Sequence, residues 1–229
     1  MSRETLETER VKAWRRRVRS SWLRLTGRPE ESTYWLVRSL PGFLPKDDVR
    51  LLYRTAAEAQ GPGDIAEIGS WMGKSTVAIA RSLVDHKVAG CRIFAIDPHA
   101  GSSNQGDEIA RAGSTLPHFQ ANVRMAKVAH LVEPLVMPSV QAGAELARRN
   151  VRLRLAFIDG LHDEEPVRAD IRAFRPLMKP RGLMAFHDCN PEGGQFPGVW
   201  KALEGELLST GAADPVAHTS HLWVVRLRD

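Results

Sequence analysis

Two apolar runs in the chain, at residues 155–158 and 183–186, lead directly into polar side chains that could bind a metal ion or move a proton. Such short runs, bounded by turn residues, are typical of strands buried on both faces of a parallel sheet. Ligands of these sheets bind in the crevice outside the carboxyl ends of the strands. If the two strands are neighbours, four side chains meet there: Asp159, His162, His187 and Asp188. Carboxylates beside imidazoles predict a small metal site next to a general base.

A glycine-rich turn joins a predicted strand to a predicted helix in segment 65–76, which reads IAEIGSWMGKST. A phosphate-binding P-loop needs four residues between its first glycine and the Gly-Lys pair, whereas Gly69 and Gly73 enclose three. A dinucleotide-binding turn needs a middle glycine that admits the pyrophosphate, and position 71 is Trp. The turn therefore predicts a ligand that approaches the backbone closely without presenting a phosphate to it.

Two further carboxylates lie near the ends of the first two predicted strands. Glu67 stands beside the glycine turn, and Asp97 ends the second strand. A carboxylate at the position of Asp97 can accept hydrogen bonds from the hydroxyls of a ribose. Glu67 adds negative charge near the turn, which favours a cationic ligand over a phosphate. S-adenosylmethionine carries a sulfonium and a ribose but no phosphate, so it meets these requirements.

At these residues the chain resembles the class I methyltransferases, whose first motif is an E-x-G-x-x-x-G turn followed by an acid that ends the second strand. Five motifs in order extend the resemblance over about residues 40–228. They are EIGS at 67–70, GKST at 73–76, IDPH at 96–99, IDGLH at 158–162 and FHD at 186–188. The series is similar to the metal-dependent O-methyltransferases of sugars and natural products, the group that contains macrocin O-methyltransferase and the cephalosporin hydroxylase-like proteins.

The resemblance implies transfer of a methyl group from S-adenosylmethionine to a hydroxyl of a sugar or saccharide, with a magnesium ion (Mg2+) as second cofactor. It implies Asp159, His187 and Asp188 as metal ligands and His162 as the catalytic base. The adjacent pair is usually acidic in this group and Mg2+ prefers oxygen, so Asn190 competes with His187 as the third ligand. The residues expected to hold S-adenosylmethionine are Glu67, Gly69, Ser70, Gly73, Ser75, Asp97 and Ser139.

The acceptor expected from this resemblance is a small molecule or oligosaccharide with vicinal oxygens. Actinobacterial enzymes that methylate mannosides of polymethylated polysaccharides belong to the same group, and they suggest a mannoside as one acceptor. Two other classes stay open: a nucleotide-dependent kinase that uses the near-P-loop, and a non-catalytic protein that binds a membrane or a partner.

Strands and helices alternate from residue 64 onward, and repeated β-α units imply right-handed crossovers. We predict a doubly wound, Rossmann-like α/β fold whose seven-stranded sheet is mostly parallel and ends in an antiparallel strand. The predicted strands are 64–70, 91–97, 131–137, 153–159, 182–188, 215–218 and 222–227, and the predicted helices are 74–85, 118–127, 142–149, 164–174 and 199–208. The polar loop 99–115 is predicted to be a lid over the cofactor.

Residues 1–40 are predicted to form a basic helical appendage to a methyltransferase domain at 41–229. Apolar residues recur there at three- and four-residue spacing: Val11, Trp14, Val18, Trp22 and Leu25. Residues 1–31 also hold nine Lys or Arg against five Asp or Glu. Such an amphipathic basic helix packs on its own domain or on a second copy in a homodimer, or it binds an anionic membrane surface.

The remaining 198 residues carry +1 of the formal net charge of +5. This near-neutral body argues against a nucleic-acid partner. Cys91 and Cys189 are predicted at opposite edges of the sheet, too far apart for a disulfide, and free thiols favour a cytoplasmic location. The sequence has no apolar run of membrane-spanning length.

Overall fold

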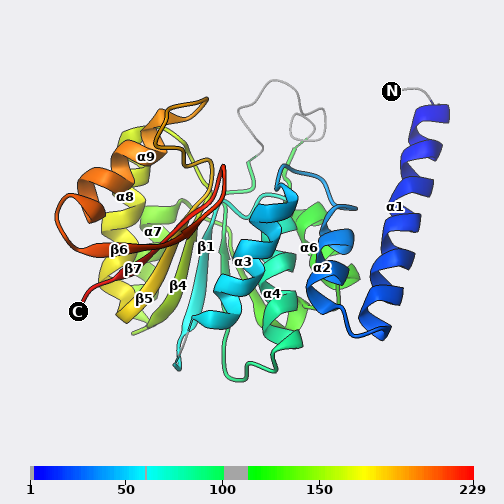
Figure 1. Cartoon of the computed structure of the whole chain (residues 1–229), viewed down its shortest axis with the longest axis horizontal. Helices are drawn as coiled ribbons and strands as arrows, with labels where there is room; N and C mark the ends of the chain where they lie inside the picture. The colour runs from blue at the N-terminus through cyan, green and yellow to red at the C-terminus, as the bar shows by residue number, and fades with distance from the viewer. Residues whose placement is uncertain (1–2, 60, 101–112) are drawn as a thin grey trace.

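The computed structural model describes residues 3–59, 61–100 and 113–229, with side chains from residue 7 onward. A seven-stranded sheet lies at its centre, with helices on both faces (Figure 1). The strands are β1 (Asp64–Ile68), β2 (Ile93–Ile96), β3 (Val132–Leu135), β4 (Leu153–Ile158), β5 (Met178–Phe186), β6 (Ala213–His218) and β7 (Trp223–Leu227). The main helices are α1 (Arg3–Leu25), α2 (Pro29–Val37), α3 (Lys46–Glu58), α4 (Lys74–Asp85), α6 (Leu116–Met125), α7 (Ser139–Arg148), α8 (Glu164–Phe174) and α9 (Pro197–Leu203).

The strand order is β3-β2-β1-β4-β5-β7-β6, which confirms the predicted doubly wound, mostly parallel fold. The first five strands in this order are parallel, and β7 pairs antiparallel with both β5 and β6. The chain therefore places β6, and not the last strand, at the edge of the sheet. Exposed residues and Pro215 make β6 suited to an edge, whereas β7 is largely buried. The strand order reverses between β1 and β4, and this reversal creates the crevice.

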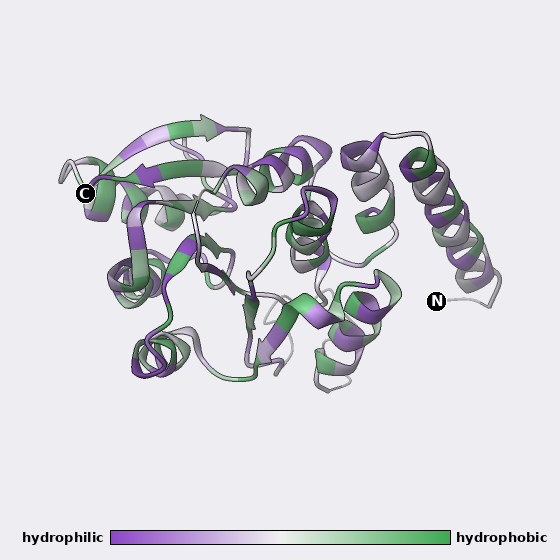
Figure 2. Ribbon diagram, turned by 90° about the horizontal axis from the view of Figure 1, so that it is seen from below, coloured by the Kyte–Doolittle hydropathy of each residue, from purple (hydrophilic) through white to green (hydrophobic). Residues whose placement is uncertain are grey.

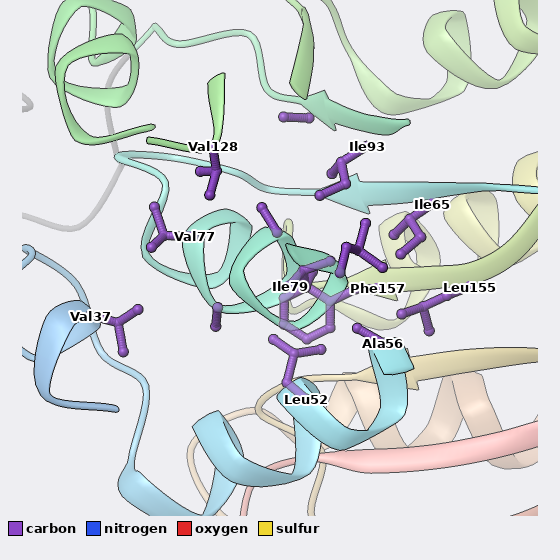
Figure 3. Close-up of a cluster of buried hydrophobic side chains, with 14 of the residues drawn as sticks. Val37, Leu52, Ala56, Ile65, Val77, Ile79, Ile93, Val128, Leu155 and Phe157 are labelled. Atoms are coloured by element: carbon purple, nitrogen blue, oxygen red, sulfur yellow. The ribbon is translucent and has the colours of Figure 1, made fainter. Parts of the chain in front are cut away.

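The core consists of one apolar cluster on each face of the sheet. Side chains alternate along a strand, so Ile65 of β1 packs with Leu52 of α3 and Ile79 of α4 on one face (Figure 3). The next residue, Ala66, packs on the opposite face, under α7, α8 and α9. By the same alternation, Glu67 lies on the α4 face.

Helices α4 and α8 begin and end as predicted, and the other predicted helices are present with shifted boundaries. Helix α3 was not predicted. Both cysteines are free, as expected, and both are buried. Most of the predicted lid, 99–115, lies outside the described residues. The division into an appendage and a domain at residue 40 stays a prediction.

The predicted N-terminal amphipathic helix is present as α1, which lies at the margin of the molecule beside α2 (Figure 1). It packs through Ser20 and Leu23, which are 5 % and 2 % exposed. The Ser20 hydroxyl lies 3.1 Å from the Ser32 hydroxyl of α2. The packed face is thus opposite to the predicted apolar one. Across the described part of the chain, no helix has both the length and the apolar character needed to cross a membrane.

Candidate functional site

The crevice at the carboxyl ends of β1 and β4 is closed at its base by backbone contact. Gly69, directly after β1, has a φ of +87°, and a Cβ atom there would lie 2.0 Å from the carbonyl oxygen of Asp159. The Asp159 N–H also donates to the carbonyl oxygen of Ile68 over 2.8 Å. Only glycine fits this approach. The glycine turn and the predicted metal ligand Asp159 are therefore immediate neighbours.

Asp159, His162 and Asp188 form a half-buried cluster whose potential ligand atoms all lie within 4.8 Å of one another. The His162 Nε2 atom is 3.2 Å from Asp188 Oδ2 and 3.7 Å from Asp159 Oδ1. The ring of Phe196 stacks on His162 at a centroid distance of 4.2 Å and fixes the plane of the imidazole. These three residues are among the four side chains predicted from the two apolar runs.

The fourth, His187, lies deeper and bridges two carboxylates. Its Nδ1 atom is 3.2 Å from Asp159 Oδ1, and its Nε2 atom is 3.3 Å from Asp48 Oδ2. His187 and Asp48 are 2 % and 1 % exposed, and Thr219 donates a hydrogen bond to the second oxygen of Asp48. Sequence reasoning missed Asp48, because an acidic residue in the first turn of a helix is ordinary and it lies 139 positions from His187.

The carboxylates and the imidazoles of this site shift one another's pKa values. Burial lowers the pKa of His162, but Asp159 and Asp188 raise it to about 9. Burial also lowers the pKa of His187, but Asp159, Asp188 and Asp48 raise this pKa to about 12. The pKa of Asp188 falls well below its usual range because the two imidazoles outweigh its own burial. Without a bound cation, two imidazolium groups therefore face the carboxylates of the site. Once His187 gives up a proton, as a histidine ligand must, its ring nitrogen and the carboxylate oxygens form a donor set that fits a divalent cation.

The competing third ligand, Asn190, has its side-chain oxygen engaged in a turn, where it accepts a hydrogen bond from the Glu192 N–H over 2.9 Å. The Nδ1 atom of His187, in contrast, faces Asp159 and lies 3.6 Å from Asp188 Oδ2. A histidine ligand commonly donates its other ring N–H to a carboxylate, and Asp48 occupies that place. This arrangement favours His187 over Asn190.

Asp97 lies at the same edge of the sheet, after β2, with both carboxylate oxygens fixed by the backbone. Oδ2 accepts a hydrogen bond from the Trp71 N–H over 2.8 Å, and Oδ1 accepts one from the His99 N–H over 2.7 Å. Trp71, His99 and Asp188 all have positive φ angles of 40° to 53°. Non-glycine residues adopt this backbone rarely, although four others elsewhere in the described chain also have it.

Buried polar atoms beside the glycine turn are left without partners. Glu67 is fully buried and accepts a hydrogen bond from Thr76 at Oε2, but its Oε1 has no partner among the described residues. The buried Ser70 hydroxyl is also unpaired within the same part of the chain. Such atoms are rare unless a ligand or water completes them. They fit a ligand that brings polar groups to this turn.

The other residues predicted to hold the cofactor are placed around the turn. Gly73, with a φ of +84°, and Ser75 lie at the start of α4, and the Ser75 hydroxyl lowers the pKa of Glu67. Ser139 begins α7, and its hydroxyl donates to Asp170 of α8 over 2.5 Å. The cofactor contacts of all these residues stay predictions.

Lys74 contributes to the site in a way that the sequence did not indicate. Its ammonium donates to the carbonyl oxygens of Leu40 and Gly42, and burial lowers its pKa to about 8. The lysine thus connects segment 40–43 to the start of α4, next to the glycine turn. A P-loop lysine binds a phosphate, whereas the ammonium of Lys74 is already engaged by these two carbonyl oxygens. Phe43 comes directly after Gly42 and is 66 % exposed, and the centroid of its ring lies 5.6 Å from that of His221.

Replacing Glu67 with glutamine is expected to stabilise the ligand-free protein above pH 7 by up to about 3 kcal/mol. Burial raises the pKa of Glu67 from 4.5 to about 7, so between these values the unfolded chain ionises while the folded chain stays protonated, and stability falls. Urea unfolding at pH 4.5 and pH 8 measures the effect. The two proteins should be similar at the lower pH and differ at the higher, and an equal difference at both would contradict the raised pKa.

Comparison with known proteins adds a family and a fold. A family model described as "Methyltransferase domain" matches residues 66–189, which include Glu67, Gly69, Asp97, Asp159 and Asp188. The structure is similar to that of CalS11, a TDP-rhamnose 3'-O-methyltransferase of calicheamicin biosynthesis, with 24 % identity, a TM-score of 0.58, and coverage of 100 % of this chain and 96 % of that chain.

Two other solved structures have the same fold. An O-methyltransferase from Bacillus cereus in complex with SAH has 16 % identity and a TM-score of 0.64 over 87 % of this chain and 90 % of that chain. The O-methyltransferase TomG from Streptomyces achromogenes, in complex with SAM, has 17 % identity and a TM-score of 0.59 over 82 % of each chain. At these identities the likeness establishes a shared fold.

Proposed function

The chain belongs to the methyltransferase domain family, and on this premise we propose that it transfers a methyl group from S-adenosylmethionine to a hydroxyl of a sugar or saccharide with the help of a divalent cation. The observation that carries the proposal is the cluster of Asp159, His162 and Asp188 in backbone contact with the glycine turn through Gly69. A donor site and an acceptor site side by side are what a direct transfer needs.

On the donor side, S-adenosylmethionine supplies the electrophilic methyl group. Asp97, held by two backbone N–H groups, would accept hydrogen bonds from the ribose hydroxyls. Glu67 Oε1 and the Ser70 hydroxyl, which have no partner among the described residues, would bind polar groups near the sulfonium. Gly69, Gly73 and Ser75 would shape the turn, and Ser139 would border the adenine.

On the acceptor side, Asp159, Asp188 and His187 would hold the cation, with Mg2+ the expected ion. A bound cation lowers the pKa of a hydroxyl and fixes its position. His162 would accept the hydroxyl proton at Nε2, because Phe196 holds its ring toward the two carboxylates. Positive charge between these carboxylates would also remove the interaction that raises the pKa of His162.

A sugar acceptor is supported by two observations. CalS11 is named as a TDP-rhamnose 3'-O-methyltransferase, and the exposed ring of Phe43 lies 6.3 Å from the ring of His187 and 5.6 Å from that of His221. Aromatic faces beside polar ligands suit the mixed apolar and hydroxyl surfaces of a sugar. Vicinal hydroxyls would let the acceptor reach both the cation and His162, and a mannoside meets this requirement.

Calorimetry is expected to show binding of S-adenosylmethionine, and incubation with Mg2+ and nucleotide-linked or mannoside sugars should yield a product heavier by one methylene.

Asp97→Asn should weaken S-adenosylmethionine binding about ten-fold, because hydrogen bonds to a charged carboxylate are about twice as strong as neutral ones. The exposed Asp163→Asn is the control and should bind normally. Absence of S-adenosylmethionine binding by the intact protein would end the proposal.

A further inference from the structure

The outward face of α1 carries an exposed apolar stripe. Its members are Val11, Trp14, Val18, Trp22 and Leu25, each 46 % to 87 % exposed, and we call them the outer stripe. They recur every three or four residues, so they fall on one side of the helix along about 20 Å. Figure 2 shows hydrophobic and hydrophilic residues in turn along α1. The opposite side already packs on α2, so packing among the described residues does not account for the outer stripe.

Unpaired arginines border the outer stripe on both sides. With 3.6 residues per turn, Arg15 falls on one flank, and Arg10 and Arg17 fall on the other. All three are exposed, and none has a carboxylate partner within the described residues. Cations turned toward the packed side do have partners, since Arg24 pairs with Asp85 and Lys12 with Glu9. The outer stripe therefore combines apolar surface with positive charge that no described carboxylate neutralises.

We propose that the outer stripe binds the surface of an anionic phospholipid bilayer, with α1 lying in the plane of the interface. Tryptophan prefers the boundary between headgroups and acyl chains, where Trp14 and Trp22 would insert. Arg10, Arg15 and Arg17 would then meet the lipid phosphates, and each arginine near such a surface strengthens binding roughly five-fold.

A second copy of the chain fits this surface less well. Pairing two α1 helices through their outer stripes places arginines opposite arginines in either orientation, because both flanks are basic. Like charges across a helix pair oppose association. Among the described acidic side chains near the outer stripe, Glu9 is paired with Lys12, and Glu7, at the N-terminal end of the outer stripe, cannot neutralise both flanks.

Flotation of the intact protein with phospholipid vesicles tests the proposal. Vesicles with about one-third phosphatidylglycerol should bind the protein, vesicles of phosphatidylcholine alone should bind it at least about ten-fold less, and raising salt from about 50 mM to about 500 mM should release it. The Trp14→Ser/Trp22→Ser variant should lose roughly ten-fold or more in binding.

Matched variants separate the outer stripe from general charge. Arg15→Glu/Arg17→Glu should abolish binding, whereas Arg124→Glu/Lys201→Glu, which changes the net charge equally at exposed cations elsewhere, should leave most of it. Thermal unfolding and S-adenosylmethionine affinity confirm that the variants fold. Equal loss in both charge variants, or a concentration-dependent dimer that Trp14→Ser/Trp22→Ser abolishes without any vesicle binding, would overturn the proposal. None of these outcomes depends on the identity of the acceptor.

Discussion

Replacing Asp188 with asparagine is expected to lower methyl transfer at least about 100-fold and to weaken the binding of a divalent cation to a similar degree. Even the loss of an outer-sphere partner commonly lowers metal affinity 10- to 100-fold, and Asp188 is a proposed direct ligand. Asparagine is the suitable replacement because Asp188 has a φ of +53°, which asparagine tolerates better than alanine. Asp159→Asn should lower methyl transfer and cation binding to a similar degree, since both carboxylates belong to the same cluster of potential ligands.

Two measurements decide this prediction. Calorimetry with Mg2+ or Mn2+ reports cation binding, and product formation in the presence and absence of chelator reports turnover. The exposed Asp163→Asn, one residue beyond His162, should leave both unchanged. Full turnover in excess chelator, together with normal activity of both variants, would refute the role of the cation while leaving the methyl donor untouched.

Replacing Asp48 with asparagine is expected to destabilise the metal-free protein by about 3 kcal/mol, the usual effect of breaking a buried charge pair. Asp48 and His187 are both almost fully buried, and their contact links α3 to the end of β5. The same variant should weaken cation binding about 10-fold, because the imidazole of His187 loses the carboxylate that orients it.

The pH dependence of this loss has a definite sign. The pKa of His187 is raised from 6.5 to about 12, so its contribution to stability is complete below pH 6.5 and disappears as the pH approaches 12. The deficit of Asp48→Asn should therefore be largest at neutral and acid pH and should narrow under alkaline conditions. Urea unfolding at pH 6.5 and pH 10 with chelator measures it, with Asp47→Asn, exposed in the same helical turn, as control. A deficit that grew with pH would contradict an imidazolium at His187.

Local sequence patterns were sufficient for most of the fold. The apolar residues of β1 and β4 and the amphipathic periods of α4 and α8 depend on neighbours within a few residues, and those elements begin where predicted. β5 is also present, but it begins four residues before the predicted start at residue 182. The role of Gly69 in a turn was also predictable, because an acidic residue near the end of a strand, followed by spaced glycines, indicates a turn that a ligand approaches closely. The proximity of Asp159 to Asp188 followed from one further rule, that ligands gather at the carboxyl ends of parallel strands.

Other features were decided by contacts between distant segments. The sequence marked α1 as amphipathic, but only the packing of Ser20 and Leu23 on α2 showed that its apolar side faces outward. β7 lies between β5 and β6 in the sheet, and this order depends on pairing between strands that are not adjacent in the sequence.

The clearest case is His187. From sequence it was one of two competing ligands, because nothing local distinguishes it from Asn190. Its position between Asp159 and Asp48 became visible only when the fold brought α3 beside β5. Sequence by itself thus determined the elements and the chemistry available at their ends, since these depend on short-range periodicity. The tertiary structure decided which charged groups pair and which side chains face solvent, because burial and charge pairing are properties of the folded chain.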